Sequence, residues 1–299
     1  MKRIAILALV LMTGGGCKAH EAATTRGNGS AHAEAADSNA ARVTAAADSI
    51  TFPEGADGDA ARRGFAILAA TRDSLPGYVG NGLRCFSCHL DNGHRANAIP
   101  LTGVFARYPS YSTRDGRELT IQDRVNNCFR RSLAGRNVPV DSKEMHDIVA
   151  YLALVSRGFA VGERVPGQGL LKMPALTGDS VRGSAIFTAH CARCHGANGA
   201  GIPPATAVWG PRSYSIGASL ARVERAASFI RHNMPFDSAG VLNDQQAYDV
   251  AAYIVSQPRQ NSHGIEHDWP NGGAPSDVPY NTKGHAAFNP PRKLTPPVF

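Results

Sequence analysis

The sequence has little of what marks several large classes of protein. Its 299 residues include six cysteines, which are too few for a fold built on disulfides. It contains no run of about eighteen or more apolar residues, so no segment is expected to span a membrane. Charged residues make up 18 % of the chain, and the net charge of +7 is small and scattered, which argues against nucleic-acid binding.

What the chain does contain is enough apolar material for folded domains. Hydrophobic residues account for 43 % of the sequence, which is a globular composition and not a disordered one. A chain of 299 residues is long enough for two compact domains. The 31 glycines and 19 prolines predict that much of the chain lies in loops and turns.

The N-terminus has the pattern of an export signal. Lys2 and Arg3 precede a short apolar core, and small residues then lead to Cys17. A small residue before such a cysteine is typical of bacterial lipoproteins, although Gly14 stands where leucine is usual. We expect residues 1–17 to be a signal peptide with a lipid anchor at Cys17, which predicts a periplasmic, membrane-tethered protein. The alternative is ordinary cleavage, with Cys17 removed or left free.

Two similar units follow a flexible tether, which is expected at residues 18–50 because that segment has almost no large apolar residues. Each unit has an Arg-Gly pair in a predicted opening helix and an Ala-Tyr-Leu or Ala-Tyr-Ile sequence in a predicted closing helix. The opening helices are expected around residues 59–67 and 179–187, and the closing helices around residues 144–152 and 246–254. Asp141-Ser142 and Asn243-Asp244 are expected to cap the closing helices.

A Cys-x-x-Cys-His motif occurs once in each unit and is the attachment signature of c-type haem. In such motifs the two thiols bind the haem covalently and the adjacent histidine ligates its iron. The motifs therefore predict two covalently attached c-type haems. The residues assigned to haem binding are Cys85, Cys88, His89, Cys191, Cys194 and His195. A zinc site and a redox dithiol are the alternatives, and the flanking helices favour haem.

Both units resemble the class I cytochrome c fold. No segment alternates convincingly over the length of a strand, so we expect a mostly α protein with two such domains in tandem. The first domain, with haem 1, is expected at residues 51–160, and the second, with haem 2, at 179–258. A linker at 161–178 joins them, and a proline-rich extended arm at 259–299 follows.

The second iron ligand of each haem is suggested by the repeat itself. Met234 stands in an Asn-Met-Pro sequence 39 residues after His195, and Cys128 lies 39 residues after His89. We therefore expect iron ligation by His89 and Cys128 at haem 1 and by His195 and Met234 at haem 2. The alternative for Cys128 is a small buried thiol. Methionine raises a haem potential and a thiolate lowers it, so haem 1 is expected to be catalytic and haem 2 an electron relay.

Five arginines surround Cys128 in the sequence and predict an anion pocket, although arginines near a haem also pair with its propionates. Here the chain resembles the dihaem thiosulfate dehydrogenases. The resemblance covers about residues 55–280. The segments that carry it are Tyr108-Pro-Ser-Tyr111 with Arg114, Asn127-Cys128-Phe129 with Arg131-Ser132 and Gly135, Asn233-Met234-Pro235, and Asp268-Trp269-Pro270 with Val278-Pro279-Tyr280.

The resemblance implies the ligand sets given above and a reaction in which two thiosulfate ions are joined into tetrathionate. It implies that Arg114, Arg124 and Ser132 line the substrate pocket, and Arg136 lies where a basic residue is usual. In some members a lysine beside the haem 2 methionine exchanges with it as iron ligand. Asn233 occupies the position of that lysine here, so no such exchange is expected. Cys128 is expected to carry the first thiosulfate as a covalent adduct, which splits the coupling into two steps.

Several alternatives remain open from the residues alone. The reaction direction is not fixed, so a tetrathionate reductase is one alternative. A subunit that oxidises carrier-bound sulfur is another, and it needs a partner chain. A non-catalytic dihaem electron-transfer cytochrome predicts methionine or histidine at Cys128. A dihaem peroxidase needs a calcium site, and the sequence shows no acidic cluster for one. In every case a periplasmic or membrane-bound electron partner is expected.

Overall fold

The computed structural model describes residues 50–165, 167–287 and 294–295. The export signal, the lipid anchor at Cys17 and the tether, up to residue 49, lie outside the described residues. No helix in the described ranges is both long and apolar enough to cross a membrane.

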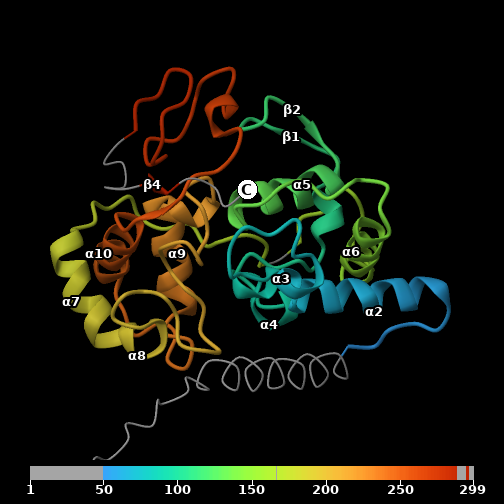
Figure 1. Cartoon of the computed structure of the whole chain (residues 1–299), viewed down its shortest axis with the longest axis horizontal. Helices are drawn as coiled ribbons and strands as arrows, with labels where there is room; N and C mark the ends of the chain where they lie inside the picture. The colour runs from blue at the N-terminus through green and yellow to red at the C-terminus, as the bar shows by residue number, and fades with distance from the viewer. Residues whose placement is uncertain (1–49, 166, 288–293, 296–299) are drawn as a thin grey trace, which may run out of the picture.

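The described chain is mostly helical, as the sequence predicts. The helices of the first unit are α2 (Ala56–Ala69), α3 (Thr71–Ser74), η1 (Cys85–Ser87), α4 (Leu90–Gly93), η2 (Val104–Arg107), α5 (Ile121–Asn127), η3 (Cys128–Ser132) and α6 (Lys143–Leu154). Those that follow are α7 (Ser180–His190), α8 (Ala192–His195), η4 (Ser219–Ala221), α9 (Val223–Asn233), α10 (Asp244–Val255) and η5 (Ile265–His267). Figure 1 shows the two helical groups beside each other, with the arm after α10, drawn in red, reaching toward the first unit.

Each unit is built on a close crossing of its opening and closing helices. A Cβ atom added to Gly64 of α2 would lie 1.9 Å from the carbonyl oxygen of Asp147 in α6. A Cβ atom added to Gly183 of α7 would lie 2.0 Å from the carbonyl oxygen of Asp249 in α10. Only a residue without a side chain permits these approaches, which explains the glycine in both Arg-Gly pairs.

The arginine of each pair fastens the same crossing. Arg63 donates two hydrogen bonds to the carboxylate of Asp147, both at 2.8 Å. Arg182 donates to the carboxylate of Asp249 at 2.7 and 2.9 Å. Both carboxylates are almost fully buried, so these paired contacts are more strongly fixed than ordinary surface ion pairs.

The closing helices begin where the sequence predicts. The side chain of Ser142 accepts a hydrogen bond from the backbone N–H of Met145, and that of Asn243 accepts one from the N–H of Gln246. The sequence does not predict helices α5 and α9. α5 ends immediately before Cys128, and α9 ends immediately before Met234. The two residues predicted as sulfur ligands therefore follow the last residues of corresponding helices in the two units.

Two hydrophobic cores meet between the units. The first contains the aromatic group Phe65, Phe86 and Tyr151, and the second contains Phe187, Trp209 and Tyr253. The first core also includes residues from beyond the linker, namely Tyr214, Ala218, Leu220, Ala221 and Phe229, and Met234 packs against both cores. This shared apolar surface holds the units together.

The strands are the main departure from the sequence-based expectation. β1 (Ser110–Ser112) pairs with β2 (Arg117–Leu119) as an antiparallel hairpin, and β3 (Arg259–Gln260) pairs in parallel with β4 (Leu294–Thr295). These strands have two or three residues each, which is too short for an alternating pattern to be recognised.

Gly64→Ala tests the crossing of α2 and α6. We expect the free energy of unfolding to fall by about 1–3 kcal/mol, because the helices must separate to admit the methyl group. Urea unfolding of the holoprotein, followed by circular dichroism, measures the change. Ala66→Ser changes an exposed position of the same helix and serves as the control. A Gly64→Ala protein as stable as the wild type would contradict this account.

Candidate functional site

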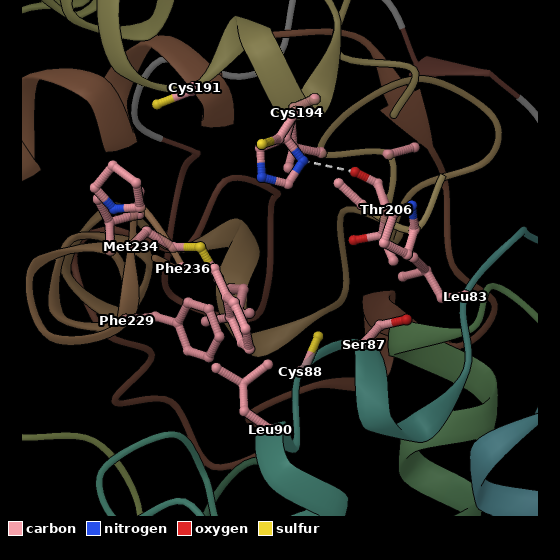
Figure 2. Close-up of a pocket in the computed structure, with 18 of the residues that line it drawn as sticks. Leu83, Ser87, Cys88, Leu90, Cys191, Cys194, Thr206, Phe229, Met234 and Phe236 are labelled. Atoms are coloured by element: carbon pink, nitrogen blue, oxygen red, sulfur yellow. Dashed lines mark hydrogen bonds between the residues drawn. The ribbon is translucent and has the colours of Figure 1, made fainter. Parts of the chain in front are cut away.

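A cavity of about 630 Å³ lies beside the second unit, and its walls carry the second Cys-x-x-Cys-His motif. Cys191, Cys194 and His195 lie in its wall together with Met234. Figure 2 shows the thioether of Met234 among apolar side chains such as Phe229, with Cys194 and Thr206 elsewhere around the pocket. The residues predicted to attach and ligate haem 2 are thus brought together around one space.

Part of the wall of this cavity belongs to the first unit. Leu83, Cys88 and Leu90, from the segment that carries the first motif, face the cavity beside residues of the second unit (Figure 2). Tyr214, which is buried in the first core, also lines it. The two motifs therefore lie on either side of a common apolar region. No described residue of the arm lines the cavity.

Both motif histidines are held in the same way. The Nδ1 atom of His89 lies 2.5 Å from the carbonyl oxygen of Ile99, and that of His195 lies 2.7 Å from the carbonyl oxygen of Thr206. A carbonyl oxygen only accepts, so Nδ1 carries the proton in each ring. The Nε2 atom of each histidine is left as the one able to ligate a metal.

The residues around the second motif fit a c-type haem. The second unit offers an apolar cavity of suitable size, with two thiols, an imidazole and a thioether in its wall. In the first unit the thiol of Cys128 contacts His89. It also lies near enough to Cys85 and Cys88 to interact with them electrostatically. Each unit thus gathers the two cysteines predicted to attach haem, a histidine and one further sulfur atom.

The environment of Cys128 differs from that of the attachment cysteines. Burial raises the pKa of Cys85 and of Cys88 to about 12. Burial acts in the same direction on Cys128, but the charge of Arg124 and the contact with His89 lower the pKa of this thiol to about 7. Cys128 begins a single π-helical turn, η3, directly after α5. Such turns occur often at functional sites.

Arg124 is the predicted pocket residue that lies against the thiol. Its Nη1 atom donates a hydrogen bond to the sulfur of Cys128 at 3.1 Å. It sits one helical turn before Cys128 on α5, so the two side chains share a face. Tyr108 borders the same pair, and although burial raises its pKa, the charge of Arg124 opposes the rise.

The other predicted pocket residues make different contacts. Arg136 is exposed, donates to the carbonyl of Gly77 at 2.6 Å and lies over the ring of Tyr78. Ser132 ends η3, one turn beyond Cys128, and its carbonyl accepts a hydrogen bond from Asn81. Among the described contacts of the predicted pocket residues, the hydrogen bond of Arg124 alone reaches Cys128 directly.

Arg114 joins the first unit to the arm. It follows β1, and its Nε atom donates to the carboxylate of Asp268 at 2.8 Å. Its Nη2 atom donates to the carbonyl of Gly217 at 2.7 Å and to the hydroxyl of Tyr280. The guanidinium lies 5.0 Å from the ring centre of Trp269, and the backbone N–H of Trp269 donates to the carbonyl of Arg114. Three segments of the chain therefore meet at this one side chain.

Asp268 is the centre of this cluster and was not recognised from the sequence as a functional residue. Its side chain is 1 % exposed and also accepts hydrogen bonds from Arg131 at 2.5 Å and from Tyr280 at 2.7 Å. Arg131 in turn lies 3.2 Å from the carboxylate of Asp115. The sequence contains Asp268 within the segment that resembles the family, but only the tertiary structure shows what it binds.

Comparison with known proteins supports the assignment of both units. Residues 79–161 match the family described as SoxA/TsdA, cytochrome c domain, and residues 180–258 match the family described as cytochrome c. The expected pair of cytochrome c domains in tandem is therefore confirmed, and with it the capacity of the chain to bind haem.

Whole-chain relatives are similar over most of their length. The chain is 41 % identical over 240 residues to a thiosulfate dehydrogenase of Psychrobacter arcticus, covering 77 % of this chain and 73 % of the relative. It is also 41 % identical over 246 residues to one of Allochromatium vinosum, covering 77 % and 88 %.

A solved structure shares the fold. It is the thiosulfate dehydrogenase (TsdBA) of Marichromatium purpuratum, with a TM-score of 0.71 and 30 % identity over 81 % of this chain. The match spans 56 % of that longer chain.

Asp268→Asn tests how the arm is attached. Removing the charge leaves Arg131 buried without one of its two carboxylates, so we expect the free energy of unfolding to fall by about 3–5 kcal/mol. We also expect faster proteolysis within the arm. Calorimetry and timed digestion measure the two effects. Glu266→Gln, at an exposed position two residues away, is the matched control. Equal behaviour of both variants would contradict the role assigned to Asp268.

Proposed function

The chain belongs to the thiosulfate dehydrogenase family, and from that premise we propose that it couples two thiosulfate ions oxidatively into tetrathionate at the site of Cys128. The family makes it an oxidoreductase that acts on sulfur compounds. The more detailed proposal assigns His89 and Cys128 as the iron ligands of haem 1, and His195 and Met234 as those of haem 2.

One observation carries this proposal: a buried thiol lies within hydrogen-bond distance of a guanidinium and faces a motif histidine. The hydrogen bond from Arg124 to the sulfur of Cys128 favours the thiolate, which is the nucleophilic form. Nothing in a simple electron carrier requires this combination. In the second unit a neutral methionine stands at the corresponding place, and it serves electron transfer without requiring a neighbouring guanidinium.

The proposed roles of the residues follow from the charges involved. Two dianions repel each other strongly in a site shielded from water, and Arg124 offsets that repulsion. The thiolate of Cys128, once released from the iron that it would ligate, forms a bond to the sulfane sulfur of the first thiosulfate, and two electrons are released. The sulfane sulfur of the second thiosulfate then attacks that sulfur, tetrathionate forms, and the thiolate is regenerated. When bound, the two haems accept the electrons.

The electron route is proposed to run from haem 1 to haem 2. Cys88, which would attach haem 1, lines the cavity that would hold haem 2, and this supports a short path between them. From there the electrons would pass to a periplasmic or membrane-bound acceptor. Tetrathionate reduction uses the same residues in reverse, and assays run in both directions decide which is faster.

We further propose that the protein is exported and held at a membrane through a lipid on Cys17. Only the sequence of residues 1–17 supports this. Mass spectrometry of the mature N-terminus tests it, since the lipid adds a mass that ordinary cleavage does not.

Cys128→Gly tests the proposed nucleophile. We expect tetrathionate formation from thiosulfate and ferricyanide to be lost, because no thiol remains to carry the first thiosulfate, while both haems stay attached. A haem determination on the same sample provides the control. Undiminished turnover in a variant with two haems would refute the role of Cys128 and leave the family assignment intact.

Arg124→Gln tests the proposed offset of charge. Loss of a charge-assisted hydrogen bond costs about 1.5–3 kcal/mol, so we expect kcat/KM for thiosulfate to fall roughly 10- to 100-fold. Arg117→Gln removes an exposed arginine of β2 that pairs with Asp123, and it should leave kcat/KM unchanged. Equal loss of activity in both variants would contradict the role proposed for Arg124 in offsetting the charge of thiosulfate.

A further inference from the structure

A buried asparagine precedes each of the two sulfur residues that occupy corresponding places in the units. Asn127 stands before Cys128 and is 6 % exposed, and Asn233 stands before Met234 and is 2 % exposed. A buried amide must satisfy its hydrogen bonds within the protein, so its partners show what it connects. Those of Asn127 lie within the first unit, on Asp115 and Arg130.

Asn233 connects the end of α9 to the other unit. Its Nδ2 atom donates to the carbonyl of Phe229 in its own helix at 3.1 Å and to the carbonyl of Asn97 in the first unit at 3.3 Å. The helix ends there, and Met234 continues in an extended conformation with φ of −128° and ψ of 150°. The side chain of Asn233 therefore fixes the point from which Met234 leaves the helix.

The acceptor of the cross-unit bond lies in a strongly held loop. Asn97 and Ile99 have φ values of 62° and 54°, and for a β-branched residue such as isoleucine this left-handed conformation is costly. The N–H groups of both residues donate to carbonyls of the linker, at Gly167 and Gly169. Conformations of this cost persist only where the surroundings impose them, so the carbonyl of Asn97 is a fixed anchor.

The same loop also holds the histidine of the first motif. The carbonyl of Ile99 accepts the hydrogen bond from His89, two residues beyond the carbonyl that binds Asn233. One rigid loop thus reaches both the imidazole of the first unit and the turn that carries Met234 in the second.

We propose that Asn233 is a positioning residue that holds Met234 in place as an iron ligand of haem 2, through its bond to Asn97. The inference rests on the proposed ligand set. A methionine side chain has three rotatable bonds and a neutral sulfur, so its ligation depends on how well its backbone is held. Outer contacts of this kind tune the affinity of a metal site.

The consequence of this positioning concerns the potential of haem 2. Methionine ligation raises a haem potential, which favours electron transfer onto haem 2. Asn233 would therefore set the direction of electron flow without touching substrate. Thiosulfate binding at Cys128 should be independent of it.

The experiment uses the full-length holoprotein with Asn233→Ala. The readouts are the methionine-to-iron charge-transfer band of ferric haem, electron paramagnetic resonance, and the midpoint potential of each haem. A buried hydrogen bond contributes enough for the ratio of methionine-bound to methionine-free haem 2 to fall about three- to tenfold. The potential of haem 2 should fall, while KM for thiosulfate should not change.

Ser228→Ala is the matched control. Ser228 lies on the same helix, is 3 % exposed, and donates one hydrogen bond to the carbonyl of Leu171 in the linker at 2.7 Å. Removing its hydroxyl deprives α9 of one buried hydrogen bond, as Asn233→Ala does, but at a position away from Met234. It should lower stability without altering the charge-transfer band.

A second variant covers the case in which Asn233→Ala does not fold. Asn233→Ser retains a hydroxyl that reaches the carbonyl of Phe229 in its own helix but is too short for that of Asn97. It should show the same spectral change. An unchanged charge-transfer band and potential in the folded variants would overturn the inference. Absence of that band from the wild-type protein would instead refute Met234 as a ligand.

Discussion

The close crossing of an opening and a closing helix is the constraint on which both units depend. Gly64 and Gly183 let the backbones approach until no side chain fits between them, and an arginine beside each glycine grips a buried aspartate of the facing helix. This crossing closes one end of each unit. The segment between the two helices must then form the rest of the unit, and it carries every residue that would bind haem.

Charge is arranged differently at the two places where arginines gather. Near the arm, Arg114 and Arg131 are matched by the carboxylate of Asp268. At the thiol, Arg124 forms no ion pair with a carboxylate within the described part of the chain, and its hydrogen bond goes to Cys128. A matched arginine holds structure together, whereas the charge of Arg124 is directed at a sulfur atom. The same residue type therefore serves two purposes within one short segment.

The sequence was informative where the determinants are local and repeated. Helix periodicity, caps such as Ser142 and the equal spacing of Cys128 and Met234 from their histidines could be read directly. It was uninformative where a contact joins distant segments. Neither Asp268 nor Asn97 differs locally from any other polar loop residue, and the contacts of Asp268 with Arg114 and of Asn97 with Asn233 span more than a hundred positions. Strands of two or three residues also carry no pattern of their own.

Cys88 of the first unit lines the same cavity as Cys191 and Cys194 of the second, so the walls of this cavity are made jointly by the two units. Neither half of the chain alone supplies the full set of side chains that line it. A substitution that shifts how the units pack would therefore change the shape of this space as well as the stability of the protein.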